Sequence, residues 1–300
     1  MKKILITGAG SYIGTSVKKW LSQFPDKYQT DELDMKDSSW KAWDFSIYDV
    51  VFHVAGLAHA DVGKVSEERK KDYYRVNCNL AIETAKKAKA EGVKHFIFMS
   101  SMIVYGGSGR IGEKKVITPK TVPVPQNFYG DSKLQAENGI LSLADDVFNV
   151  TVLRPPMIYG NGSKGNYNLL SKLAHLLPVF PDIRNERSML YIDNLCEYVR
   201  LTVDTGQEGI LFPQNKEYGR TTDIVKMIAA VHGKKIWTTQ LFNWLIVLIG
   251  KTSGKNGQMV NKAFGNLVYE KDMSRCFIRG IDYHVASLEE SVKLSENSLK

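Results

Sequence analysis

The chain of 300 residues is long enough for one large domain or for two that share an interface. Hydrophobic residues make up 43% of it and charged residues 24%, which is ordinary for a globular protein and excludes disorder as the main state. The net charge of +8 favours anionic partners, and because its lysines and arginines are spread along the chain we expect a phosphorylated small molecule rather than nucleic acid.

Short apolar runs alternate with longer amphipathic runs in the first half of the chain. Strands are predicted at residues 4–7, 48–55, 95–101 and 150–154, and helices at 13–24, 73–90 and 132–144. Strands that alternate with helices in this way predict a parallel sheet with right-handed crossovers, covered on both faces. We therefore expect an α/β fold with a Rossmann-type doubly wound sheet.

The pattern changes after Pro155-Pro156, where a loop rich in glycine and asparagine covers residues 160–166. Further helices are predicted at 169–177, 194–203 and 222–232, and Thr222 with Asp223 supplies a capping signal for the last one. We expect a dinucleotide-binding domain over residues 1–160, to which part of 188–205 returns. Residues 161–300 should then form a smaller, mainly substrate-binding α/β lobe.

The cysteines, Cys78, Cys196 and Cys276, are far apart and form no Cys-x-x-Cys pair. They predict neither a disulfide framework nor a zinc site, so we expect a reducing compartment, the cytoplasm. The N-terminus has the pattern of a first strand rather than of a signal peptide. The apolar stretch 241–249 is too short to span a bilayer, so no stable membrane insertion is expected. We predict a buried or interface helix there, with contact to a membrane surface as the alternative.

A glycine-rich loop lies between the first predicted strand and the first predicted helix. Glycines let the backbone turn sharply and approach a pyrophosphate, and the helix N-terminus behind them offers free N–H groups. A tight turn without a ligand is the alternative, but the strand-to-helix context favours a dinucleotide. The residues expected at this cofactor are Gly8, Gly10, Ser11, Tyr12, Ile13 and Gly14.

An acid about twenty residues beyond this loop normally accepts the hydroxyls of the adenosine ribose. Asp34 has that spacing from Gly14. A carboxylate there repels a 2′-phosphate and favours NAD over NADP, although Lys36 nearby weakens the preference. Asp31 and Glu32 are alternatives for the same role.

Tyr129 and Lys133 are four residues apart, so they share one face of any helix that begins there. A neighbouring ammonium group lowers the pKa of a phenol, which would let Tyr129 exchange a proton with a sugar hydroxyl near neutral pH. The same lysine can hold the nicotinamide ribose. Ser100-Ser101 ends a predicted strand upstream and would bring a hydroxyl beside Tyr129.

Together these segments resemble the extended short-chain dehydrogenase/reductase family of nucleotide-sugar epimerases, dehydratases and 4-keto reductases. The resemblance covers the chain to about residue 200 and is looser beyond it. It implies Ser101, Tyr129 and Lys133 as catalytic residues. It adds to the cofactor site Asp44, Phe45, Val54, Ala55, Gly56, Asn77 and Pro156. It places at the substrate Ser101, Met102, Met157, Lys164, Asn166 and Arg187, with Arg187 on the diphosphate.

Three departures from the family pattern concern the cofactor loop and the expected reaction. Ser11 stands where the loop usually has glycine. Met102 and Ile103 stand where dehydratases carry an Asp-Glu pair, and this argues against a 4,6-dehydratase. Met157 stands where epimerases often have asparagine, and the surrounding sequence is closer to reductases that make 6-deoxy-HexNAc nucleotides.

The resemblance therefore implies redox chemistry at C4 of a nucleotide-linked hexose, a UDP-hexose or UDP-HexNAc, by a 4-epimerase or a 4-keto reductase that uses NAD, or else NADP. A role in the synthesis of surface glycan precursors and a homodimer are also expected. The alternative is a non-catalytic NAD(P)-binding regulatory or scaffold protein, although such proteins typically lose the tyrosine and lysine. His53, His59 and His95 show no metal-ligand spacing, so no metal is expected, and His59 is a candidate to border the cofactor pocket.

Overall fold

Six parallel strands form the central sheet. From one edge to the other the strands are β2 (Tyr28–Leu33), β1 (Lys2–Thr7), β3 (Val50–His53), β4 (His95–Met99), β6 (Asn149–Leu153) and β10 (Gly209–Leu211). The expected doubly wound parallel sheet is confirmed. In the usual six-strand order of dinucleotide-binding sheets, one more strand lies outside β2. In this chain the segment between β2 and β3 contains a short 3₁₀ helix, η1 (Ser38–Ala42), in place of that strand.

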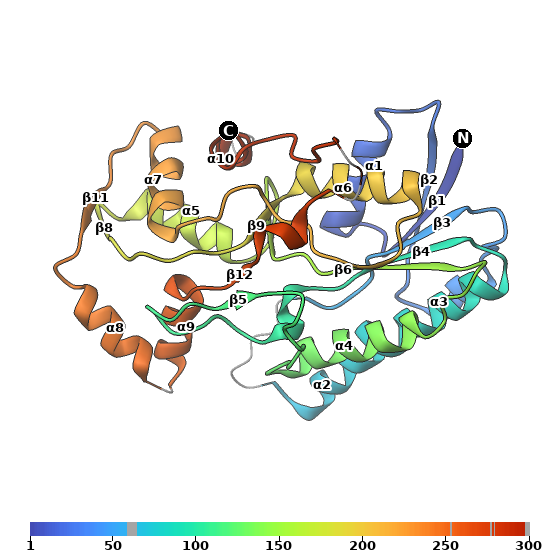
Figure 1. Cartoon of the computed structure of the whole chain (residues 1–300), viewed down its shortest axis with the longest axis horizontal. Coiled ribbons are helices and arrows are strands. Elements are labelled where there is room, and N and C mark those ends of the chain that lie inside the picture. Colours follow the sequence, from blue (N-terminus) through green and yellow to red (C-terminus); the bar gives the residue numbers. More distant parts are fainter. Residues whose placement is uncertain (59–64, 253, 277, 279, 298–300) are drawn as a thin grey trace.

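Both faces of this sheet are buried, because alternate residues of each strand enter different cores. In β1, Ile4 and Ile6 belong to the core that includes α1 (Tyr12–Leu21) and α6 (Ile192–Thr205). Leu5 belongs to the core on the other face, against α3 (Leu80–Ala90) and α4 (Phe128–Leu141). Figure 1 shows these two helix pairs above and below the sheet.

The computed structural model describes residues 1–58, 65–252, 254–276, 278 and 280–297. Outside the sheet the strands form three parallel pairs: β5 (Val116–Ile117) with β12 (Val268–Tyr269), β7 (Met157–Tyr159) with β9 (Met189–Tyr191), and β8 (Val179–Pro181) with β11 (Trp237–Thr239). The other helices are α2 (Glu67–Tyr73), η2 (Tyr74–Asn79), η3 (Met102–Tyr105), α5 (Asn166–Leu176), α7 (Thr221–Val231), α8 (Asn243–Lys251), α9 (Lys255–Phe264), η4 (Lys271–Ser274) and α10 (Leu288–Asn297). In Figure 1, α5, α7, α8 and α9 lie at the end of the molecule away from the sheet.

The chain after residue 188 contributes both to the central sheet with its covering helices and to a strand pair outside the sheet. Helix α6 packs against α1, and β10 pairs with β6 at the sheet edge. Residues 268–269 of β12 lie beside β5, far from them in sequence. The division of the chain near residue 160 remains a prediction.

Two sequence-based expectations were wrong in detail, and for a third, the buried or interface helix expected at 241–249, the structure excludes burial. The single helix expected at 73–90 is interrupted by one turn of π-helix, η2, and π-turns are frequent at functional sites. Thr222 does not cap α7, because the N-cap is Arg220 and the Thr222 hydroxyl donates to the carbonyl of Pro181 at 2.9 Å. The apolar stretch 241–249 is not buried: it contributes most of α8, and several of its large side chains are exposed.

No helix within the described part of the chain is long and apolar enough to cross a membrane. A cytoplasmic location remains a prediction.

Burial of His53 in the sheet predicts a loss of stability in acid. Its ring lies between Phe96 and Phe98, its Nδ1 is 2.8 Å from the Thr7 hydroxyl, and burial lowers its pKa to about 3. Below pH 6.5 the unfolded chain therefore binds a proton that the folded chain does not. The free energy of unfolding should fall by about 3 kcal/mol from this group between pH 6.5 and 4. Urea unfolding at several pH values should show a shallower dependence for His53→Asn; the same dependence as in the wild type would contradict this assignment.

Candidate active site

The glycine loop follows β1 and approaches β3 so closely that side chains are excluded. Gly8 has a φ of 102°, and a Cβ built on it would lie 2.8 Å from the backbone nitrogen of Ala55. Gly10 has a φ of 71°, with open space around its missing Cβ. Gly14 packs on the Ser11 side chain, and a Cβ there would lie 2.7 Å from the Ser11 Oγ. This is the close backbone path that a pyrophosphate-binding turn requires.

Ser11 replaces the usual glycine and acts as the N-cap of α1. Its Oγ accepts a hydrogen bond from the Gly14 N–H at 3.2 Å. The N–H groups of Tyr12 and Ile13 come earlier in the first turn, where a helix offers no carbonyl partner. They remain suited to an anion. The Tyr12 side chain extends away from the loop toward Gly160, where a Cβ would lie 2.7 Å from the Tyr12 hydroxyl.

Three acids were considered for the ribose, and the structure separates them. Asp31 accepts a hydrogen bond from the Tyr48 hydroxyl at 3.0 Å, and Glu32 forms an ion pair with Lys18 at 2.8 Å. Asp34 directly follows β2, and its exposed side chain accepts from the Lys36 N–H at 3.0 Å and forms an ion pair with the Lys36 ammonium at 3.2 Å. The exposed carboxylate at the end of β2 is thus the one least committed to the fold.

Asp44 and Phe45 do not form an obvious adenine contact. The Asp44 carboxylate accepts hydrogen bonds from the backbone and side chain of Ser46, at 2.9 and 2.6 Å. The Phe45 ring is fully buried, and its N–H donates to Glu91 at 2.6 Å. The role expected for this pair remains a prediction.

The segment after β3 joins the cofactor loop to the catalytic residues. Val54 and Ala55 follow the strand, and Ala55 contacts Gly8. A Cβ built on Gly56 would lie 3.0 Å from the Asn77 side-chain oxygen and 3.3 Å from the Lys133 Nζ. Asn77, in the π-turn of η2, holds the next residue by accepting from the Leu57 N–H at 2.7 Å and donating to its carbonyl at 3.0 Å.

Ser101, Tyr129 and Lys133 converge at the carboxyl end of β4. Ser101 is the N-cap of η3, Tyr129 lies in the first turn of α4, and Lys133 lies one turn later. A hydrogen bond from Ser101 reaches the Tyr129 hydroxyl. The Lys133 ammonium donates to the carbonyl of Met99 at 2.8 Å and lies 4.6 Å from the centre of the Phe98 ring.

The expected effect of Lys133 on the acidity of Tyr129 is not found in this arrangement. Burial raises the pKa of Tyr129 to about 12, although the bond from Ser101 acts in the opposite direction. Burial also lowers the pKa of Lys133 to about 8. Tyr129 is therefore protonated at neutral pH and can donate its proton to a developing alkoxide.

A buried ion pair behind these residues was not anticipated. Arg154 donates to both carboxylate oxygens of Glu137, with its closest contact at 2.5 Å, and to the Tyr105 hydroxyl at 2.6 Å. Ser100 donates to the same carboxylate. Glu137 lies four residues after Lys133 on α4, so the two share one face of the helix. This spacing was the one feature of the sequence that could have placed Glu137 near the catalytic residues. The pair ties α4 to the end of β6.

The residues expected at the substrate are dispersed around this centre. The N–H of buried Met102 donates to Pro155 at 2.8 Å, so η3 and the buried Pro156 are adjacent. Met157 begins β7 and is partly exposed, Lys164 is exposed, and Asn166 begins α5.

Arg187 lies between the segment that follows η3 and the end of α9. Its guanidinium donates to the Ser108 hydroxyl at 3.0 Å and to the Gly265 carbonyl at 3.1 Å. No carboxylate among the described residues forms an ion pair with it. Burial lowers the pKa of Arg187 to about 10, so it remains charged at neutral pH and available to an anion.

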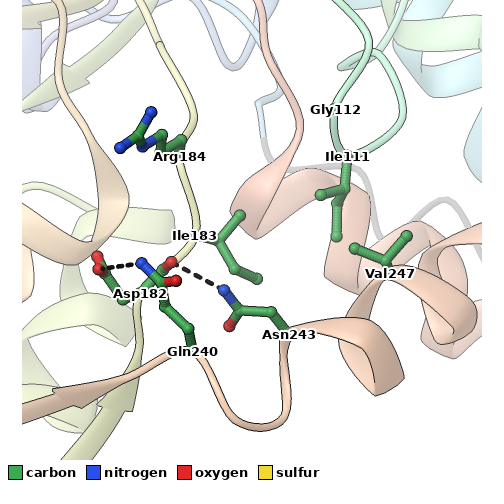
Figure 2. A pocket seen from close by; sticks show the side chains of 8 residues that line it. All are labelled: Ile111, Gly112, Asp182, Ile183, Arg184, Gln240, Asn243 and Val247. Carbon is green, nitrogen blue, oxygen red and sulfur yellow. Dashed lines mark hydrogen bonds between the residues drawn. The ribbon is translucent and has the colours of Figure 1, made fainter.

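Two further features lie away from this centre. A cavity of about 310 Å³, shown in Figure 2, is bordered by Ile111, Arg184 and Val247, and none of its eight lining residues belongs to the predicted sites. Among the described residues, His175, His232 and Glu296 have possible metal-ligand atoms within 4.8 Å of one another. The absence of a metal remains a prediction. His59 lies outside the described residues.

The sequence profile of the NAD dependent epimerase/dehydratase family matches residues 4–212. The chain belongs to this family. It is 29% identical to a UDP-glucose 4-epimerase of Vibrio cholerae over 287 residues, which cover 89% of this chain and 86% of the relative. It is 28% identical over 214 residues to the N-acetyl-alpha-D-glucosaminyl-diphospho-ditrans,octacis-undecaprenol 4-epimerase of Escherichia coli O157:H7, covering 66% and 62% of the two chains.

The fold is also similar to that of UDP-glucuronic acid 4-epimerase from Bacillus cereus, solved in complex with NAD. The TM-score is 0.73 at 17% identity, with 99% of this chain and 96% of the other covered. Membership of the NAD dependent epimerase/dehydratase family confirms the family expected from the motifs and NAD as its cofactor. The tight Gly8–Ala55 contact and the free N–H groups at α1 fit that cofactor.

Proposed function

We propose that this member of the family carries out NAD(P)-dependent redox chemistry at C4 of a nucleotide-linked hexose, with a UDP-sugar as the expected substrate. The convergence of Ser101, Tyr129 and Lys133 supports this proposal, because it sets a proton-donating phenol beside the segment that follows β3. An unpaired guanidinium, that of Arg187, supports a diphosphate substrate.

NAD supplies the hydride acceptor and donor at C4 when it is bound. The residues that would hold it are the glycine loop, Asp34, Gly56, Asn77 and Lys133. Their positions at the carboxyl ends of β1 to β4 are those where ligands of open α/β sheets bind.

Tyr129 exchanges the proton of the C4 oxygen. Ser101 donates a hydrogen bond to the Tyr129 hydroxyl and thereby stabilises its phenolate once the proton has left. Lys133 adds positive charge next to Gly56 and helps to orient the cofactor. Met102 and Ile103 carry no group that could protonate a leaving hydroxyl, and this supports the exclusion of 4,6-dehydratase chemistry.

Between the two C4 reactions, we place the 4-epimerase first, because both relatives described above carry that name. The 4-keto reductase is the second candidate, because Met157 occupies the position where epimerases often have asparagine. The Escherichia coli relative is named for a sugar diphosphate on a polyprenol, so the test below includes that carrier.

The first experiment incubates the purified protein, without added cofactor, with UDP-glucose, UDP-GlcNAc, their galacto epimers and a polyprenyl-diphosphate GlcNAc. The C4 configuration is followed by NMR. Interconversion would assign a 4-epimerase and identify its sugar and carrier. In a second assay, NAD(P)H and a 4-keto-6-deoxy sugar nucleotide are added. Oxidation of NAD(P)H with this substrate only would assign a reductase. No reaction with any of these substrates would contradict the proposal.

Removal of the Arg187 charge should weaken substrate binding more than it slows turnover. For Arg187→Gln we expect KM for the sugar nucleotide to rise roughly 10- to 100-fold, the value of a hydrogen bond to a charged group, while kcat changes little. Arg184→Gln is the matched control, since Arg184 is an exposed arginine three residues earlier. Equal effects of both substitutions would show that Arg187 has no specific role at the diphosphate.

A further inference from the structure

Helix α8 and the turn before it present an exposed apolar surface. Its residues, called the α8 surface below, are Leu241, Phe242, Trp244, Leu245 and Leu248. Leu241 is 69% exposed and Trp244 is 67% exposed. A contiguous apolar patch of this kind on a globular protein indicates an interaction site.

The other side of α8 is anchored, which fixes the side that faces outward. The Asn243 side chain donates to the Asp182 carbonyl at 2.9 Å, and Figure 2 shows Val247 turned toward Ile111. At the end of the helix, the buried Gly250 accepts a hydrogen bond from Asn261 of α9 at 2.7 Å. In Figure 1, α8 lies at the lower left, at the opposite end of the molecule from β1 and β2, with nothing drawn beyond it.

The sequence on either side of α8 carries charges of one sign. Residues 224–269 contain no aspartate or glutamate, although the whole chain has 32. The same stretch contains six lysines, all of them exposed: Lys226, Lys234, Lys235, Lys251, Lys255 and Lys262. Asp182, whose carbonyl accepts from Asn243 at the start of α8, is paired through its carboxylate with Arg220 at 2.5 Å.

We propose that the α8 surface docks on an anionic lipid bilayer. Exposed Trp, Phe and Leu side chains can enter the boundary between head groups and acyl chains, and tryptophan favours that boundary. Exposed lysines around them attract anionic head groups. The nine-residue helix is only about 14 Å long, so it would lie in the plane of the interface and not cross the bilayer.

The charge pattern favours a membrane over a second copy of the chain. In a two-fold dimer the same patch meets itself, so the lysines of one copy would face those of the other with no acid in this stretch to pair with them. An anionic bilayer instead offers opposite charge and an apolar interior together.

The test measures binding of the full chain to vesicles by co-sedimentation. Phosphatidylcholine vesicles are compared with vesicles that also contain phosphatidylglycerol. We expect the wild type to bind only the anionic vesicles, and less tightly at high salt. Phe242→Ser with Trp244→Ser should abolish this binding. The matched control is Val122→Ser with Val147→Ser, because both valines are also highly exposed, at 73% and 75%.

A second pair of variants tests the charges. Lys251→Gln with Lys255→Gln should weaken binding to anionic vesicles by about fivefold for each lysine removed. Lys71→Gln with Lys120→Gln, two exposed lysines elsewhere, should bind like the wild type. Urea unfolding of each variant verifies that it is folded.

Three outcomes would overturn the proposal. The first is a folded wild type that binds neither type of vesicle. The second is a control pair that loses as much binding as the α8 variants. The third is a wild-type dimer, seen by light scattering, that Phe242→Ser with Trp244→Ser converts to a monomer while vesicle binding is absent. That result would show that a second copy covers the α8 surface.

Discussion

Tyr129→Phe should lower kcat by about 1,000-fold, because the variant keeps the ring but loses the hydroxyl that exchanges the proton at C4. NAD binding should remain close to that of the wild type, since the phenol lies with Ser101 and not in the glycine loop. Turnover is measured with the substrate found by NMR, and NAD binding by calorimetry. Unchanged turnover would exclude Tyr129 as the group that exchanges the proton, and with it the proposed mechanism.

A matched control for this variant lies on the neighbouring π-turn. Tyr74 also has a hydrogen-bonded hydroxyl, which donates to Asp131 on α4 at 2.7 Å, but it does not contact Ser101. Tyr74→Phe should therefore retain most of the activity. A similar loss in both variants would indicate a general disturbance of α4 and not removal of an acid.

Glu137→Leu should be strongly destabilising, because it leaves the Arg154 guanidinium buried without its carboxylate. Glu137 is fully buried and the Arg154 side chain is 5% exposed, so water cannot replace the lost contact. We expect the free energy of unfolding, measured in urea, to fall by about 3–5 kcal/mol. The double variant Glu137→Leu with Arg154→Met removes both charges and should recover much of that loss. A double variant as unstable as the single one would contradict the importance of the unpaired charge.

The sheet could be predicted from sequence because its signal is local. Apolar runs that alternate with amphipathic runs locate β1, β3, β4 and β6 to within a few residues, and both sheet faces are buried as the unbroken apolar runs require. The glycine loop was predictable for a similar reason, since a strand, a tight turn and a helix follow one another directly.

Features that depend on packing between distant segments were not predictable. The Glu137–Arg154 pair joins positions 17 residues apart, and only the folded sheet reveals it. The pKa of Tyr129 was expected to fall with Lys133 nearby, but burial raises it, and spacing along a helix does not measure desolvation.

The sequence left burial, an interface and membrane contact open for α8, because an apolar sequence indicates what a side chain prefers and not whether another segment covers it. Its neighbours anchor one side only, through Asn243 and Gly250. The role of a single site residue depends on the ligand that it binds, which the sequence does not show. The roles assigned to Asp34 and Arg187 therefore remain proposals.

The most direct test of the central claim follows the hydride itself. The protein is loaded with NADH that carries deuterium at both positions of nicotinamide C4 and is given a 4-keto nucleotide sugar. A 4-epimerase and a 4-keto reductase should both give product with deuterium at C4 of the hexose, detected by NMR. A reduced sugar without deuterium, or with deuterium at another carbon, would contradict redox chemistry at C4.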